Sequence, residues 1–132
     1  MKTSKRILLV EDQREYSLMV KVLLCEKYEV RMASNGLEAI NEMEKGFIPD
    51  VIVTDVVMPV LDGFRFLTVL KNHKRFKYIP VIWLTCLDQS NVRNYESKRL
   101  VRRVIIKPFE AEKLLKELIP AIEDTHGIAS IN

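Results

Sequence analysis

This chain of 132 residues is poor in glycine, cysteine and tryptophan, with 4, 2 and 1 of each. So few cysteines exclude a fold that depends on a disulfide framework. The scarce glycines also leave no loop rich enough in Gly, Ser or Thr to hold the phosphate group of a flavin or similar cofactor. No helix-turn-helix, zinc finger or RNA-binding motif is present. These absences argue against a flavin enzyme and against a nucleic-acid-binding domain.

No apolar run in the sequence is long enough to cross a membrane. Asp55 and Asp88 interrupt the longest stretches well before the roughly 18 residues that a span requires. The basic N-terminus precedes only the short run 7–10, which is too short for a signal peptide and is expected to form a strand. Cys25 and Cys86 lack metal-ligand spacing and fall in segments expected to be at least half-buried. We therefore expect reduced core cysteines in a cytoplasmic protein.

Apolar segments that are typical of buried strands alternate with amphipathic segments along the chain. With 48% hydrophobic and 30% charged residues, the composition is that of one globular domain. Strands are expected at 6–10, 28–33, 51–54, 81–85 and 101–106, and helices at 13–27, 36–45, 64–72, 89–100 and 110–119. The segment 89–100 is only weakly amphipathic, and no clear pattern follows Pro120. We expect a domain over 1–122 and a C-terminal tail or the start of a linker at 123–132.

Five strands alternating with five helices predict an α/β fold with a doubly wound parallel sheet in the order 2-1-3-4-5. In such a sheet the carboxyl ends of the first and third strands lie side by side, and ligands bind there. Polar residues follow or end four of the five strands: Glu11 and Asp12, Asp55, Thr85 and Lys107. Three carboxylates at one point repel one another unless a cation lies between them, and Mg²⁺ is the hard divalent ion that prefers oxygen ligands.

Each of these residues also has an ordinary structural interpretation. Glu11 and Asp12 suit the N-terminus of a helix, where the dipole favours acids. Thr85 suits a helix N-cap, Lys107 a solvated surface, and Asp55 the cap of a turn before Pro59. Their joint occurrence at four strand ends is harder to explain in that way. The pattern therefore favours a functional site.

Four segments, ILLVED, VIVTDVVMPVLDG, VIWLT and IIKPF, in that order and spacing, resemble the receiver domain of bacterial two-component response regulators. The resemblance implies the flavodoxin-like receiver fold and a phosphoacceptor, Asp55, that takes a phosphoryl group from a histidine kinase, a phosphotransfer protein or a small phosphodonor. It also implies Mg²⁺ held by Glu11, Asp12, Asp55 and the backbone carbonyl of Val57. Thr85 would hydrogen-bond the phosphoryl group and Lys107 would pair with it, before a peptide bond to Pro108 that is usually cis. Such a domain catalyses only its own phosphorylation and dephosphorylation.

The chain departs from this family at positions that matter for signalling. Val104 stands where the family usually has an aromatic residue that moves with the threonine, and Leu100 and Val101 replace a common Gly-Ala pair. With the weak segment 89–100, this predicts a fourth helix that is short, shifted or mobile. Cys86 replaces a smaller alanine beside the site. An alternative interpretation is therefore a receiver-like interaction module that is weakly coupled to phosphorylation.

Basic residues give the chain a net charge of +3 and concentrate in two segments, 71–77 and 93–103. The second segment predicts a face near Arg93 to Arg103 that could meet an acidic partner surface, although most charged faces are simply solvated. We expect no nucleic acid and no membrane as partners. Homodimerisation is common in similar proteins and is left open by the sequence. A haloacid-dehalogenase-type phosphatase is excluded because it needs an acid at position 57, where Val57 stands.

Overall fold

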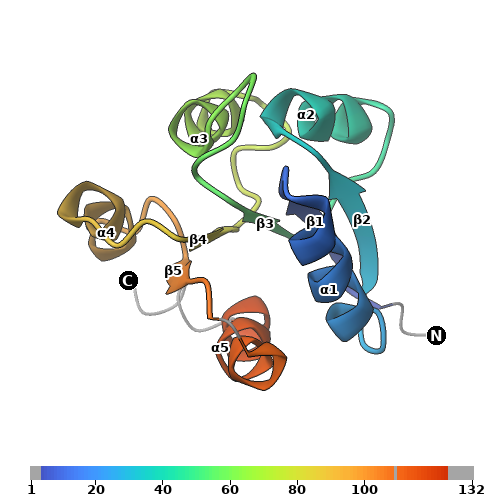
Figure 1. Cartoon of the computed structure of the whole chain (residues 1–132). Helices are drawn as coiled ribbons and strands as arrows, with labels where there is room; N and C mark the ends of the chain where they lie inside the picture. The colour runs from blue at the N-terminus through green and yellow to red at the C-terminus, as the bar shows by residue number, and fades with distance from the viewer. Residues whose placement is uncertain (1–3, 109, 125–132) are drawn as a thin grey trace.

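The computed structural model describes residues 4–108 and 110–124, and its helices and strands alternate as expected (Figure 1). The strands are β1 (Arg6–Val10), β2 (Glu29–Ala33), β3 (Val51–Thr54), β4 (Val81–Thr85) and β5 (Arg103–Ile106). The helices are α1 (Arg14–Leu24), α2 (Gly36–Glu44), α3 (Gly63–Lys71), α4 (Ser90–Ser97) and α5 (Ala111–Glu123). Among these residues no helix is long and apolar enough to span a bilayer.

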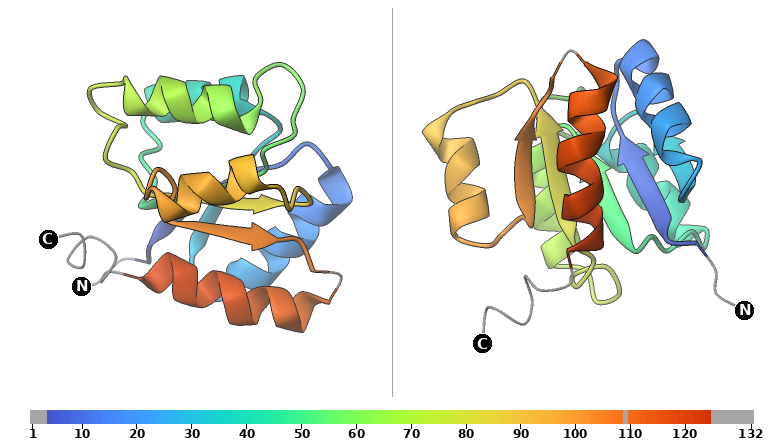
Figure 2. Two further views of the ribbon diagram at one scale, coloured as in Figure 1. Left: turned by 90° about the vertical axis from the view of Figure 1, so that its left-hand side faces the viewer. Right: turned by 90° about the horizontal axis from the view of Figure 1, so that it is seen from below.

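All five strands run parallel in the order β2-β1-β3-β4-β5, which confirms the predicted fold class. In register, Val10 at the end of β1 pairs with Thr54 at the end of β3, and Thr85 at the end of β4 pairs with Ile106 of β5. The carboxyl ends of these strands therefore meet at one edge of the sheet. The arrows of β4 and β5 in Figure 2 point toward that edge.

Helices cover both faces of the sheet, because alternate strand residues point to opposite sides. Leu8, Ile52 and Trp83 pack with residues of α2, α3 and α4 on one face. Ile7 and Val53 pack with residues of α1 and α5 on the other. Figure 1 shows α2 and α3 above the sheet and α5 below it. Both faces of the central strands are thus dry, which explains their nearly continuous apolar sequences.

Two helices end in the same hydrogen-bonded motif, once with glycine and once without it. After α2, Gly46 has a φ of 116°, its N–H donates to Met43, and the Phe47 N–H donates to Glu42. This is a Schellman motif with glycine at the left-handed position. After α4, Arg99 takes the same role with a φ of 61°. Because a side chain is strained in this left-handed region, the end of α4 is less favourable than that of α2.

The C-terminal helix continues further than the sequence indicated. The pattern was expected to end near Pro120, but α5 extends to Glu123, and Ala121 and Ile122 are buried. The last carbonyl groups of α5 are satisfied from outside the helix: Arg102 donates to both Ala121 and Ile122 at 3.1 and 3.2 Å. Tertiary hydrogen bonds therefore support a turn that proline and the weak pattern argue against. Most of the expected tail, 125–132, lies outside the described residues.

Three smaller expectations are wrong. Both Cys25 and Cys86 are exposed rather than in the core, because one directly follows α1 and the other begins the loop after β4. The fifth strand begins at Arg103, since Leu100 belongs to the turn that ends α4 and donates to Tyr95. The described residues contain no cis peptide bond, so the bond to Pro108 is trans.

Candidate functional site

Three acidic residues meet at the carboxyl edge of the sheet. Glu11 and Asp12 follow β1 and Asp55 follows β3, and the Asp55 N–H donates to the carbonyl of Val10 at 3.0 Å. One carboxylate oxygen from each acid lies within 4.8 Å of the other two. Glu11 and Asp55 are buried, whereas Asp12 is exposed and leaves the site open to solvent. The predicted acid cluster is thus formed by the fold.

Lys107, directly after β5, places its ammonium group between the two buried acids. Its Nζ lies 2.7 Å from Glu11 Oε1 and 2.9 Å from Asp55 Oδ2, and its side chain is 8% exposed. Burial alone would lower the pKa of Lys107, but the hydrogen bonds to Glu11 and Asp55 and the negative charges of these acids together outweigh it and raise that pKa. Lys107 therefore stays charged.

The pKa of Glu11 is also raised, because burial outweighs the hydrogen bonds from Lys107 and from the Gln13 N–H. One ammonium group cannot balance the three acids of the cluster: with all of them ionised, three negative charges against one positive leave a charge of −2. Oxygen ligands with this excess charge fit a small divalent cation. The donor set is therefore chemically suited to the metal that the sequence predicted.

Backbone groups fix the carboxylate of Asp55. Its Oδ1 accepts hydrogen bonds from the N–H groups of Val56 at 2.6 Å and Val57 at 3.3 Å, while Oδ2 faces Lys107. Gly63 then brings the start of α3 against this loop, with its N–H donating to the Val56 carbonyl at 2.7 Å. A Cβ on Gly63 would lie only 2.6 Å from Val56 Cα and 2.9 Å from the Asp55 carbonyl oxygen. Close backbone approach therefore requires glycine at position 63.

Thr85 ends β4 and is completely buried. Its hydroxyl oxygen accepts a hydrogen bond from the Leu87 N–H at 3.2 Å, and its backbone carbonyl accepts one from the Lys107 N–H at 2.8 Å. The side chain is therefore engaged with its own loop, and its backbone is bonded to the residue that faces Asp55. The structure brings Glu11, Asp12, Asp55 and Lys107 together, with Thr85 on the adjacent strand.

Tyr16 is a site residue that the sequence did not reveal, since its spacing in α1 predicts an ordinary core position. The Lys107 Nζ lies 4.7 Å from the centre of the Tyr16 ring. The Tyr16 hydroxyl is buried without a hydrogen-bond partner among the described residues, and burial raises the pKa of Tyr16 to about 12. Only the folded chain brings positions 16 and 107 together.

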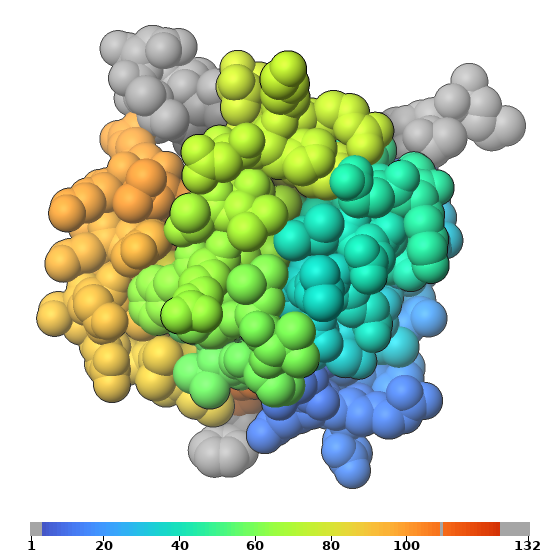
Figure 3. Space-filling model, turned by 90° about the horizontal axis from the view of Figure 1, so that it is seen from above, coloured from blue at the N-terminus to red at the C-terminus, as the bar shows by residue number. Residues whose placement is uncertain are grey.

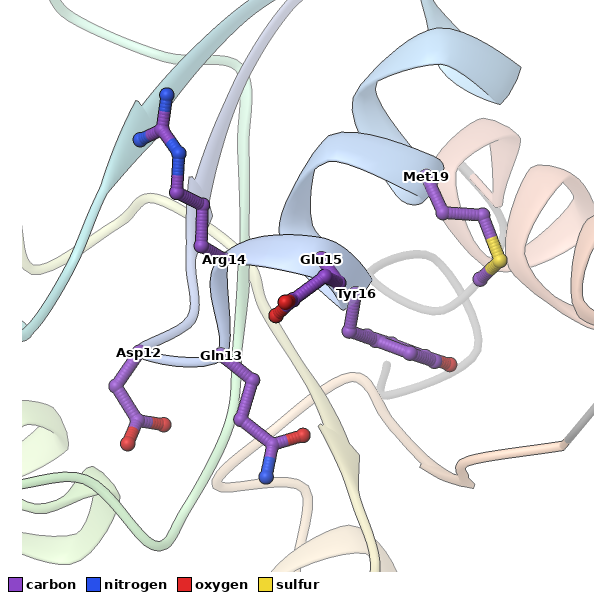
Figure 4. Close-up of a pocket in the computed structure, with 6 residues that line it drawn as sticks. All are labelled: Asp12, Gln13, Arg14, Glu15, Tyr16 and Met19. Carbon is purple, nitrogen blue, oxygen red and sulfur yellow. The ribbon is translucent and has the colours of Figure 1, made fainter.

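A shallow groove of about 630 Å³ runs along the start of α1 beside the acid cluster. It is lined by Asp12, Gln13, Arg14, Glu15, Tyr16 and Met19. In Figure 4 the side chains of Asp12 and Gln13 extend to one side of this turn, whereas Tyr16 and Met19 point to the other. Figure 3 shows the beginning of α1 and the loop before it (blue) beside the loop before α3 (green) at one edge of the molecule. The exposed Asp12 is thus accessible from this groove.

The fourth helix is short, with eight residues, of which only Val92 is buried. Hydrogen bonds to the edge strand β5 compensate for its few apolar contacts: the Val104 N–H donates to Glu96, and the Val104 carbonyl accepts from Arg93 at 3.4 Å. These bonds satisfy backbone groups that an edge strand would otherwise expose. The helix is therefore held by polar contacts to the strand that precedes Lys107 and by the apolar packing of Val92 and Tyr95.

Aromatic residues adjoin Val104 although that position is aliphatic. Trp83 pairs with Val104 in the register of β4 and β5. Its ring contacts Phe64 of α3 at a centroid distance of 5.3 Å and Tyr95 of α4 at 4.8 Å. β5 therefore lacks the aromatic residue, but an aromatic cluster is centred on Trp83 of the neighbouring strand, two residues before Thr85.

Two of the four arginines in the segment 93–103 form ion pairs within the chain. Arg93 forms ion pairs with Asp88 and Glu96, and Arg103 pairs with Glu96 and Asp124. These two arginines therefore add less positive charge to the predicted basic face than the sequence alone indicates, and the acidic partner stays a prediction. Lys98 and Arg99 remain exposed on this face.

A parallel sheet that gathers three acids and a lysine at its carboxyl edge defines a receiver-type α/β domain. The sequence profile of the response regulator receiver domain matches residues 7–119, and the chain belongs to this family. CheY4, the chemotaxis response regulator of Vibrio cholerae, is 34% identical and superposes with a TM-score of 0.77 over 90% of this chain and 99% of its own. The receiver domain of sensor histidine kinase PA1611 from Pseudomonas aeruginosa PAO1, solved with a magnesium ion in its active-site cleft, is 25% identical with a TM-score of 0.76, over 92% of this chain and all of its own.

Receiver domains also occur inside larger relatives. Hybrid signal transduction histidine kinase D of Dictyostelium discoideum is 33% identical over 113 residues, which are 86% of this chain but 7% of the kinase. The chain likewise spans only 54% of the probable transcriptional regulator ycf29 of Porphyra purpurea, to which it is 31% identical. The family and the fold are thus shared with both regulators and kinases.

Proposed function

We propose that this receiver domain is phosphorylated on Asp55 in a Mg²⁺-dependent reaction and that a sensor histidine kinase or a phosphotransfer protein supplies the phosphoryl group. The observation that carries the proposal is the environment of Asp55: a buried carboxylate fixed by two backbone N–H groups, facing Lys107 and adjacent to two further acids. This role places the protein in cytoplasmic two-component signalling. It needs no catalysis beyond the protein's own phosphorylation and dephosphorylation.

In the reaction, a carboxylate oxygen of Asp55 attacks phosphorus in line with the leaving group. An O–P bond forms and the P–N bond of a phosphohistidine breaks, and the departing imidazole keeps the electron pair and takes up a proton. Little covalent chemistry is required of the protein, so positioning and charge neutralisation account for the rate. Val56 and Val57 hold the carboxylate, and Lys107 stabilises negative charge on the transferring oxygens.

Glu11, Asp12, Asp55 and the backbone carbonyl of Val57 would hold Mg²⁺, which supplies further positive charge to the phosphoryl oxygens. Thr85 would exchange its bond with the Leu87 N–H for one in which its hydroxyl donates to the new phosphoryl group. Because Thr85 precedes the loop to α4, this exchange gives a route from the site to that helix. Cys86, exposed in the same loop, would limit the access of the water that hydrolyses the phosphoryl group.

The test is phosphorylation of the purified protein with acetyl phosphate, followed by intact mass. With Mg²⁺ we expect the mass of one added phosphoryl group, which EDTA and Asp55→Asn should each abolish. Asp62→Asn is the matched control, because Asp62 caps α3 through the Arg65 N–H but lies outside the acid cluster. Equal phosphorylation of the Asp55→Asn variant and the wild type would contradict the proposal.

A second candidate is an interaction module whose partner binds regardless of phosphorylation, and the short α4 beside the aliphatic Val104 favours it. Beryllofluoride with Mg²⁺ separates the two, because it imitates a bound phosphoryl group. A coupled switch predicts amide shifts that spread from Asp55 through α4 to Lys107 in two-dimensional NMR spectra. Shifts confined to the loops of Asp12 and Asp55 would favour the interaction module.

A further inference from the structure

Lys107 has three neighbours in the site, and two of them are carboxylates with other roles. Its ammonium group has three N–H donors, and the bonds to Glu11 and Asp55 occupy two. In the proposed function both acids also bind the metal, and Asp55 becomes esterified. Each of these events weakens the hold of the carboxylates on Lys107. The ring of Tyr16 is the neighbour that neither metal binding nor phosphorylation changes.

We propose that Tyr16 is the positioning residue for Lys107, and that its aromatic face keeps the ammonium group at the phosphorylation site during the reaction. This inference rests on the proposed function. The Nζ lies 4.7 Å from the ring centre, within the range of a cation–π contact, and the side chain of Lys107 is 8% exposed. A contact of this kind strengthens as water is excluded. Lysine needs such a support because its flexible stem otherwise samples many conformations.

The ring itself is held by the fold. Tyr16 lies in the first turns of α1 and packs against the apolar cluster that α1 shares with α5. Its hydroxyl has no hydrogen-bond partner among residues 4–108 and 110–124. The ring face, and not the hydroxyl, therefore carries the interaction. Tyr16→Phe keeps the ring and should preserve the interaction with Lys107, whereas Tyr16→Leu removes the ring and should abolish it.

The first experiment compares initial rates of phosphorylation by acetyl phosphate with saturating Mg²⁺. We expect Tyr16→Leu to be slower by about fivefold or more, the effect of losing a partly desolvated cation–π contact. Tyr16→Phe should remain within about twofold of the wild type, as should the matched control Met19→Leu, which changes the same groove. The affinity for Mg²⁺ measured by calorimetry should not fall in any of the three variants, because the acids are intact. A general disturbance of the site would lower that affinity as well.

A double-mutant cycle identifies Lys107 as the residue through which Tyr16 acts. In the Lys107→Ala background, Tyr16→Leu should cause no further loss of rate. An equal loss in both backgrounds, or a Tyr16→Leu variant as fast as Tyr16→Phe, would overturn the proposal.

Failure of the proposed function can be told apart from failure of this inference. A wild type that gains no phosphoryl group contradicts the proposed function alone. The position of Lys107 is then tested by NMR, since the ring current of Tyr16 shifts the Lys107 Hε resonances upfield. Loss of that shift in Tyr16→Leu but not in Tyr16→Phe supports the inference, and resonances that are the same in both contradict it.

Discussion

Replacing Lys107 by methionine tests how the charges of the site are balanced. The substitution keeps the apolar stem and removes the ammonium group that lies 2.7 Å from Glu11 and 2.9 Å from Asp55. The side chains involved are 8%, 2% and 8% exposed, so the two acids lose their counterion in a nearly dry environment. Removing one partner of a buried ion pair costs about 3–5 kcal/mol. Burial already raises the pKa of Glu11, so this carboxylate can take up a proton when Lys107 is removed. We therefore expect a cost at the lower end of this range, about 3 kcal/mol.

The assay is urea unfolding followed by the fluorescence of Trp83, the single tryptophan, which is fully buried. In EDTA we expect the variant to lose about 3 kcal/mol of unfolding free energy, or about 10 °C in Tm. Mg²⁺ at a concentration 100 times its Kd for the variant should restore about 2.7 kcal/mol to the variant, and the wild type is compared at the same concentration. Mg²⁺ should stabilise the wild type less, because there the metal must displace Lys107 from the same acids.

Lys116→Met is the matched control, since Lys116 is exposed on α5. It should change stability by no more than about 0.5 kcal/mol in either condition. A Lys107→Met variant as stable as the wild type in EDTA would refute the reasoning, as would equal stabilisation of both proteins by Mg²⁺.

Four other substitutions test parts of the fold outside the acid cluster. Gly63→Ala should cost about 1–3 kcal/mol in urea unfolding, because its Cβ would overlap backbone atoms, and an unchanged midpoint would contradict the close approach. Arg99→Gly should stabilise the protein by about 1 kcal/mol, because glycine adopts the positive φ without strain. Gly46→Ala should destabilise it by a similar amount for the same reason. Stability changes of the same sign in both variants would contradict the shared motif. Tyr28→Phe removes the 2.6 Å hydrogen bond to Glu123 and should cost about 1 kcal/mol at pH 7, less than a buried bond because the Glu123 side chain is 41% exposed. That bond lowers the pKa of Glu123 below its ordinary value of 4.5. The stability that the bond contributes is therefore complete above pH 4.5 and disappears as the pH falls through the lowered pKa. A stability difference between variant and wild type that stays constant down to about pH 2 would contradict this account.

Much of the fold could be predicted because the relevant signals are local. Buried parallel strands are apolar throughout, and Gly46 marks the end of α2 through its own backbone preference. The continuation of α5 beyond Pro120 could not be predicted, since it depends on Arg102 donating to the last carbonyls of the helix. The exposure of Cys86 likewise depends on how the loop after β4 leaves the sheet.

The site residues divide in the same way into those with a local sequence signal and those that depend on tertiary contacts. Glu11, Asp12, Asp55 and Lys107 could be located from the sequence, because each directly follows a strand and parallel strands end at one edge. The role of Tyr16 could not, since apolar spacing within a helix gives no sign of which distant side chain a ring will contact. The ion pairs that neutralise the arginines near α4 were missed for the same reason: sequence shows charges, but pairing depends on how α4, β5 and α5 meet.

The most direct test of the central claim is to find which residue carries the phosphoryl group. Protein phosphorylated with acetyl phosphate and Mg²⁺ is treated with borohydride, which reduces an aspartyl phosphate to homoserine, and its peptides are sequenced by mass spectrometry. The account predicts homoserine at position 55 and at no other acid. Homoserine at Asp12, or an unmodified position 55 in protein that has gained a phosphoryl group, would contradict it.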